Sequence, residues 1–150
     1  MRTHRNAVLV VLLVALASVS AASIGASPSA HGSVYGKVLG LNEPCVQFAF
    51  NVQDTGPEPD DDRGTLSGRL FDPETGKLTA VLVSTDVFNV VVNSDGTIYF
   101  VATLRPVVGE LPTPQDTFQF YGHDGGAIDQ FRIAVFDVEI IRAAIVARTP

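Results

Sequence analysis

The sequence predicts an all-β domain, an antiparallel β-sandwich or barrel of about eight or nine strands. Residues 45–53 alternate between apolar and mostly polar side chains, which is typical of a half-buried strand. Runs of β-branched and aromatic residues recur along the chain, and turn-forming residues separate them at 72–76, 93–96 and 122–126. No segment in the middle of the chain keeps a helical period.

The expected strands follow one another at short intervals. They cover residues 34–39 with an interruption at Gly36, then 45–53, 66–71, 77–83, 87–92, 97–104, 117–121 and 130–136. The tetrad 93–96 between two β-branched runs predicts a hairpin turn. Pro106 marks the end of the strand before it, because proline lacks a backbone donor. The last segment, 138–147, fits a helix, while 143–148 could be a closing strand, and we favour the strand because it would cover a sheet edge.

The N-terminus has the three-part layout of a secretory signal peptide. Arg2, His4 and Arg5 precede an apolar run at 7–17, and a tract of small residues follows. The apolar run is too short to cross a bilayer, which needs about 20 apolar residues, so we expect no stable membrane anchor after cleavage. The sequence therefore predicts a signal peptide plus flexible leader over 1–30 and one domain over 31–150, secreted to the extracellular space, with the periplasm as the alternative.

Charge and cysteine usage limit the partners of this domain. Residues 31–150 carry eight Lys and Arg against sixteen Asp and Glu, a formal charge of −8. This acidity argues against nucleic acid and anionic membranes, which require clustered basic residues. Cys45 is the only cysteine, so no internal disulfide can form, and we expect it to be a buried small apolar residue at the start of a strand.

Candidate catalytic residues are few. His123 and Asp124 lie in a glycine-flanked loop, where a general base could be exposed and oriented, but no nucleophile motif accompanies them. The alternative is a tight turn in which Asp124 caps backbone donors. A pair of carboxylates among Glu110, Asp116 and Asp129 is conceivable, although the sequence does not place any two of them. We expect no cofactor, because no phosphate-binding loop and no zinc-ligand spacing is present.

The stretch 54–64 is strongly acidic. Asp54, Asp60, Asp61 and Asp62 are candidate calcium ligands, since hard cations bind carboxylate oxygens in flexible loops. Their spacing does not match the alternating ligand loop with its central glycine. A solvated hairpin loop is the favoured interpretation.

Two aromatic residues are candidate ligand contacts. The phenylalanines alternate as core residues would, and we assign Phe48, Phe50, Phe118, Phe120 and Phe131 to the core. Tyr99 and Tyr121 fall on the opposite faces of their strands from Phe100 and Phe120, so they would face solvent.

Several strand and turn patterns resemble those of a known group of domains. These are the alternating run 48–53, the strand after Gly64 that leads to the D-x-x-T-G turn beginning at Asp72, and the late run 129–133. Across about residues 47–137 the chain resembles the small secreted bacterial β-domains labelled post-COAP. The resemblance implies an extracellular all-β domain without established activity, and it supplies no catalytic residues. The closing segment departs from that pattern.

Three functional hypotheses follow from these features. The leading one is a secreted, non-enzymatic domain that acts as a binding, adhesive or structural accessory module for an extracellular protein or polysaccharide. The second is a secreted hydrolase that uses His123 and Asp124. The third is a secreted effector or inhibitor that presents the proline-containing loop 107–115.

Overall fold

The computed structural model describes residues 26–39, 44–125, 129–134 and 138–150, without the side chains of 59 and 138–141. Eight strands form one antiparallel sheet in the order β7-β6-β5-β4-β3-β2-β1-β8. Their bounds are β1 (Ser29–Val38), β2 (Cys45–Gln53), β3 (Arg63–Phe71), β4 (Leu78–Val92), β5 (Thr97–Val108), β6 (Thr117–His123), β7 (Gln130–Ile133) and β8 (Val138–Arg148). The prediction of an all-β antiparallel fold is confirmed, and no α-helix occurs in the described ranges.

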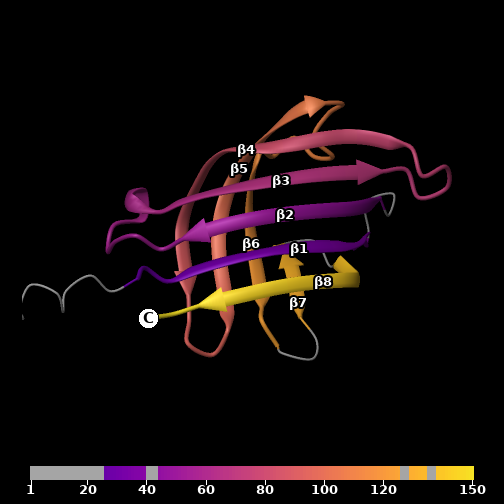
Figure 1. The fold of residues 1–150 in the computed structure, drawn as a ribbon. Coiled ribbons are helices and arrows are strands. Elements are labelled where there is room, and N and C mark those ends of the chain that lie inside the picture. Colours follow the sequence, from indigo (N-terminus) through magenta and orange to yellow (C-terminus); the bar gives the residue numbers. More distant parts are fainter. Residues whose placement is uncertain (1–25, 40–43, 126–128, 135–137) are drawn as a thin grey trace, which may run out of the picture.

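The sheet curls into a nearly closed barrel. Strands β1 to β7 form an up-and-down meander, and β8 returns to pair with β1. Strands β8, β1, β2 and β3 lie side by side in front, and β5, β6 and β7 run crosswise behind them (Figure 1). The two ends of the sheet order, β7 and β8, meet along a line that we call the seam.

One long bent strand connects the front of the barrel to the back. The sequence predicted separate strands at 77–83 and 87–92, and this was wrong, because β4 runs continuously through both. Its pairing with β5 shifts register at three places, one of them between Phe88 and Val91. Asn89 has a φ of 52° inside that last bulge. Bulges let one strand bend while it stays paired, so β4 crosses from one layer to the other.

Strand β5 also extends further than expected. Pro106 was predicted to end the strand, yet β5 continues to Val108 and Pro106 faces Leu82 of β4. The pairing of β5 with β6 ends at Thr103. Beyond that point β5 has a neighbour on one side only, where a missing backbone donor is tolerated.

The ends of the described chain are strands too. A closing strand was predicted at 143–148, and β8 confirms it, although the strand already begins at Val138 and pairs along the whole of β1. Ser29 and Ala30, which the sequence places in the leader, are the first residues of β1, and Ala30 is buried. The basic and apolar parts of the predicted signal peptide lie outside the described residues. No helix in the described part of the chain is long and apolar enough to cross a membrane.

Phenylalanine rings fill the barrel interior. Phe48, Phe50, Phe100, Phe120 and Phe131 are each at most 4% exposed, and their ring centroids lie 5.0–6.1 Å apart. Room for them comes from glycine on the neighbouring strand. A Cβ atom on Gly68 would lie 2.7 Å from the Phe48 ring, so a larger residue there would require the ring to move.

The assignment of the predicted phenylalanines to the core is confirmed. Phe118 is also buried, with 7% of its surface exposed. Cys45 begins β2, as expected, and is half-buried rather than fully buried.

Candidate functional site

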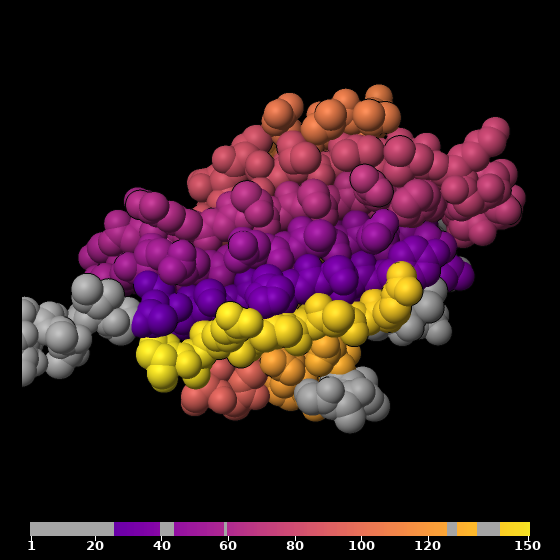
Figure 2. Space-filling model, in the orientation of Figure 1, coloured from indigo at the N-terminus to yellow at the C-terminus, as the bar shows by residue number. Residues whose placement is uncertain are grey.

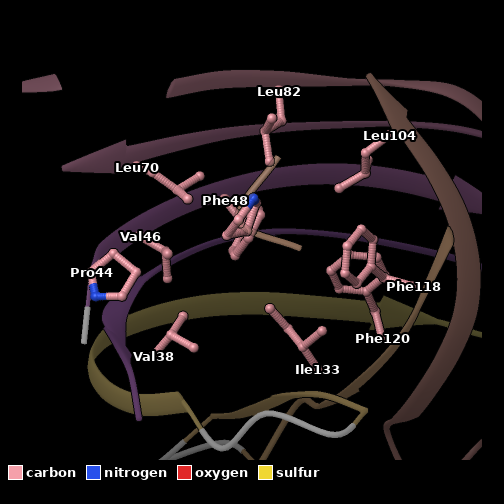
Figure 3. Close-up of a pocket in the computed structure, with 11 residues that line it drawn as sticks. Val38, Pro44, Val46, Phe48, Leu70, Leu82, Leu104, Phe118, Phe120 and Ile133 are labelled. Atoms are coloured by element: carbon pink, nitrogen blue, oxygen red, sulfur yellow. The ribbon is translucent and has the colours of Figure 1, made fainter. Parts of the chain in front are cut away.

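The barrel interior offers little room for a ligand. One apolar cavity of about 40 Å³ lies inside the barrel, and Figure 3 shows side chains of Val46, Phe48, Phe118 and Phe120 around it, with Pro44 at its margin. Pockets that hold small molecules are typically about 300–1,000 Å³. A ligand of ordinary size therefore does not fit this cavity.

The loop between β2 and β3 ends at Asp62, whose carboxylate holds the backbone. Asp62 Oδ2 accepts a hydrogen bond from the Val90 amide at 2.6 Å, and its Oδ1 accepts one from the Thr55 amide at 3.3 Å. Val90 follows Asn89 in the β4 bulge, where a strand amide has lost its regular partner. Asp62 thus fixes both the loop and the bulge.

The other calcium candidates are not gathered around Asp62. Asp60 and Asp61 belong to a short 3-10 turn, Pro59–Asp61, and both are exposed. Asp54 lies at the start of the loop and its backbone amide donates to the Pro28 carbonyl. Within the described ranges, no three Asp, Glu, His or Cys residues are grouped so that they could hold a metal ion.

The candidate pair His123 and Asp124 lies at the same end of the barrel, but the two side chains have separate partners. The His123 ring donates through Nε2 to the Asp95 carbonyl oxygen at 3.1 Å. The Asp124 carboxylate accepts a hydrogen bond from the Ala147 amide of β8 at 3.2 Å. Among the described residues, no hydrogen bond joins His123 to Asp124, so the arrangement is not a base held by a carboxylate.

At the seam, the Asp129 carboxylate also accepts hydrogen bonds from backbone amides. Its Oδ2 accepts a hydrogen bond from the Ile145 amide at 2.6 Å, and its Oδ1 accepts one from the Gly125 amide at 3.1 Å. Ile145 and Ala147 belong to the edge of β8 that is turned away from β1. Carboxylates therefore satisfy strand amides that would otherwise be unpaired where the barrel closes.

Tyr99 and Tyr121 lie together on the outer surface. They are directly opposite each other on β5 and β6, with ring centroids 5.0 Å apart and an interplanar angle of 48°. Tyr121 is 42% exposed, and its hydroxyl donates to Oε1 of Gln119 at 3.2 Å. Partial burial, followed by the neighbouring Tyr121, raises the pKa of Tyr99 above its usual value. Both side chains thus face outward, as predicted.

An open groove of about 450 Å³ adjoins this tyrosine pair. Tyr99 lines it together with Val91 from the β4 bulge and with the acidic loop. Asp54, Glu58 and Asp62 of that loop are among the lining residues, and the Asp62 carboxylate is already bound to the backbone. The fold thus brings two separate predictions, the tyrosines and part of the acidic loop, to one surface.

Loop 107–115 lies at the opposite end of the barrel, together with Glu110 and Asp116. Val107 and Val108 are the last residues of β5 and are more than half exposed. Gly109 has a φ of 71°, and its Cα lies so close to the Thr79 carbonyl that a side chain would not fit. Further along, Leu111 packs against the core and Pro112 lines the interior cavity. The loop is therefore docked on the barrel, and it is far from Asp129 along the strands.

Four surface residues were missed at the sequence level. Arg63 and Arg69 lie on β3, and Arg142 and Arg148 lie on β8, all exposed on the outer side of the sheet. In each strand the two arginines are six positions apart, an even spacing that places both on one face. That spacing could have identified them, but the register that aligns β3 with β8 follows only from the fold.

Comparison of the chain with family models, curated proteins and solved structures gives no match. The resemblance to post-COAP domains stays a prediction.

Proposed function

We propose that this protein is a secreted, non-enzymatic binding module that contacts an extracellular polymer through the outer surface of its barrel. One observation carries the proposal. The interior is filled with aromatic side chains, whereas Tyr99 and Tyr121 lie side by side on the outside next to an open groove. Aromatic side chains with an apolar body and a polar tip are favoured in binding surfaces.

The chemistry of the groove suggests which ligands fit. Tyr99 and Val91 supply apolar contact, while the carboxylates of Asp54 and Glu58 supply hydrogen-bond acceptors. A neutral polysaccharide offers hydroxyl donors and apolar ring faces, and a protein segment offers basic or amide side chains. An anionic ligand would be repelled here.

The two alternative functions have weaker support. A hydrolase based on His123 and Asp124 would need those side chains to act on a substrate, yet His123 is bound to the backbone of the β4–β5 turn and Asp124 to the backbone of β8. An effector that presents loop 107–115 would need a protruding loop, yet Leu111 and Pro112 pack against the barrel.

The test is a binding screen with tyrosine variants. The purified chain would be measured against immobilised neutral polysaccharides and cationic peptides, and the best ligand then titrated with Y99A/Y121A and with V107A/V108A. Val107 and Val108 are also exposed apolar residues of β5, but they lie at the opposite end of the barrel, so V107A/V108A is the control. We expect affinity to fall about tenfold or more in the tyrosine variant and to stay unchanged in V107A/V108A. Equal affinity in all three proteins would refute the tyrosine surface.

A further inference from the structure

The four arginines on the front of the barrel are aligned in two rows across the sheet. In one row the register pairs Arg142 with Tyr35, Tyr35 with Gln47, and Gln47 with Arg69. In the other row it pairs Arg148 with Ser29, Ser29 with Gln53, and Gln53 with Arg63. Each row crosses β8, β1, β2 and β3 and ends in an arginine on both sides. We call the surface that these corners enclose the arginine face.

The arginine face extends over four strands. Three strand spacings separate β8 from β3, about 14 Å, and six residues separate the two rows, about 20 Å along the strands. The floor between the rows consists of exposed residues that are small or polar except for Val146, namely Ala144, Ser33, Ala49 and Ser67 in one cross-strand row and Val146, His31, Asn51 and Thr65 in the other. Figure 2 looks onto these four strands, which form one continuous surface that no other described element covers.

Charge is segregated between this face and the rest of the molecule. Strands β1, β2 and β3 contain no Asp or Glu, and β8 contains only Glu139. The other acidic residues that the structure describes lie in the turns, loops and remaining strands, although residues 31–150 carry a net charge of −8. None of the four guanidinium groups forms an ion pair or hydrogen bond with the rest of the described chain. An acidic protein thus presents a cationic, donor-rich face to solvent.

We propose that the arginine face binds an acidic polysaccharide, with the four arginines contacting carboxylates of the chain and the amides and hydroxyls between them contacting its hydroxyl groups. Planar guanidinium groups bind carboxylates with two hydrogen bonds at once. Gln47, Gln53 and Asn51 provide both donors and acceptors, as a polyhydroxyl chain requires. This surface adjoins the tyrosine groove at one corner, where Arg63 follows Asp62, but it contains neither tyrosine of the groove and differs from it in ligand charge.

Two other occupants fit the face less well. A second copy stacked face to face would bring arginines against arginines, which repel each other. A second copy that contacted the face through one acidic loop would bury far less area than the roughly 1,200–2,000 Å² of stable interfaces. Single-stranded nucleic acid prefers several aromatic stacking platforms, and Tyr35, half-buried, is the only aromatic residue among the outward-facing positions of these rows.

The experiment uses polygalacturonate, a uronic acid homopolymer, as the probe. Binding of the purified chain to immobilised polygalacturonate would be measured between about 0.05 M and 0.5 M NaCl, because contacts between exposed charges weaken with salt. We expect binding that decreases with salt. Removing either diagonal pair, in R63Q/R142Q or R69Q/R148Q, should lower affinity about three- to tenfold, as expected for two exposed ion pairs.

The control variant K77Q/R132Q removes the same two charges from the β3–β4 turn and from β7, both outside the arginine face. It should change affinity less than about twofold. Four results would overturn the proposal: an equal loss in the control, equal binding to dextran, equal or tighter binding to single-stranded DNA, or self-association of the chain that R63Q/R142Q abolishes. Thermal unfolding of each variant would verify that the fold is retained. The tyrosine variant Y99A/Y121A should bind polygalacturonate as the wild type does. A negative result for the tyrosine groove can therefore be distinguished from a negative result for the arginine face.

Discussion

The loops at one end of the barrel and the front face of its sheet use charged residues in opposite ways. In the loops, the carboxylates of Asp62, Asp124 and Asp129 each accept at least one hydrogen bond from a backbone amide. On the front face, Arg63 and Arg69 have no partner among the described residues. Charge in the loops therefore holds the fold together, whereas these two guanidinium groups are available to an external ligand.

Backbone pairing explains this difference. Strands β1, β2 and β3 have a neighbour on both sides, so their amides and carbonyls are satisfied within the sheet. Loops, bulges and the seam leave amides without strand partners, and a buried amide without a partner costs about 1–3 kcal/mol. A short carboxylate side chain can accept from such amides. Acidic residues in these places are thus explained by hydrogen bonds to the backbone, without a metal ion.

The largest effect should come from the seam. Asp129→Ala removes two hydrogen bonds and leaves the Ile145 amide without its 2.6 Å acceptor. We expect the free energy of unfolding to fall by about 2–3 kcal/mol, because hydrogen bonds to charged groups are the stronger ones. Urea titration followed by circular dichroism would measure the loss, and amide exchange should accelerate at Ile145.

The matched control for this substitution is Asp60→Ala. Asp60 is an exposed carboxylate for which the described part of the chain provides no side-chain partner. It should change the free energy of unfolding by less than about 0.5 kcal/mol. Similar losses in the two variants would mean that net charge, and not the seam contact, sets the stability.

The bulge of β4 should respond less strongly. Asp62→Ala removes the acceptor for the Val90 amide and a longer contact to the Thr55 amide. We expect a loss of about 1–2 kcal/mol, because the loop is exposed and water can replace part of the contact. Urea titration would measure it, and exchange of the Val90 amide should rise. An unchanged Val90 amide would show that the bulge is stable without Asp62.

The sequence predicted most of the strands and turns because both depend on local patterns. Alternation over 45–53 gave the bounds of β2, and the tetrad 93–96 gave the hairpin between β4 and β5. It failed at β4, since a bulge held by the remote residue Asp62 has no local pattern. It missed the arginine face for the same reason, because the rows depend on pairing between β1 and β8, more than 100 residues apart.

The same distinction between local patterns and long-range pairing applies to the candidate site residues. Tyr99 and Tyr121 could be predicted to face outward, because each adjoins a buried phenylalanine in a strand of period two. Their contact, and the groove between Tyr99 and the acidic loop, required the register of β5 with β6 and the bend in β4. The alternative that Asp124 caps backbone donors was open from the sequence, but its partner Ala147 could not be named.

Lowering the pH should reduce the stabilisation that two turn carboxylates, Asp72 and Asp95, give to the fold. Hydrogen bonds from the Thr75 amide and hydroxyl lower the pKa of Asp72, and those from the Thr97 hydroxyl and amide lower the pKa of Asp95. A lowered pKa in the folded state stabilises the fold above the unfolded value of 3.8, and the gain is lost as the pH falls below that value. The effect should be small, because both carboxylates are exposed.

The measurement compares the wild type with D72N/D95N by urea titration from pH 7 to pH 2. The wild type should be more stable near neutral pH, and the difference should disappear below the unfolded value of 3.8 as the two carboxylates take up protons. A difference that stays constant down to pH 2 would show that the geometry of the turns, and not the charge of the carboxylates, matters.

The smallest effect should come from the arginine face itself. Arg69→Gln and Arg148→Gln remove guanidinium groups that contact no partner in the described structure, on strands whose backbone is paired. Each should change the free energy of unfolding by less than about 0.5 kcal/mol in urea titrations. A loss above about 1 kcal/mol would mean that these arginines serve the fold as the carboxylates do. Four exposed, aligned cations that add nothing to stability would instead be available to a ligand.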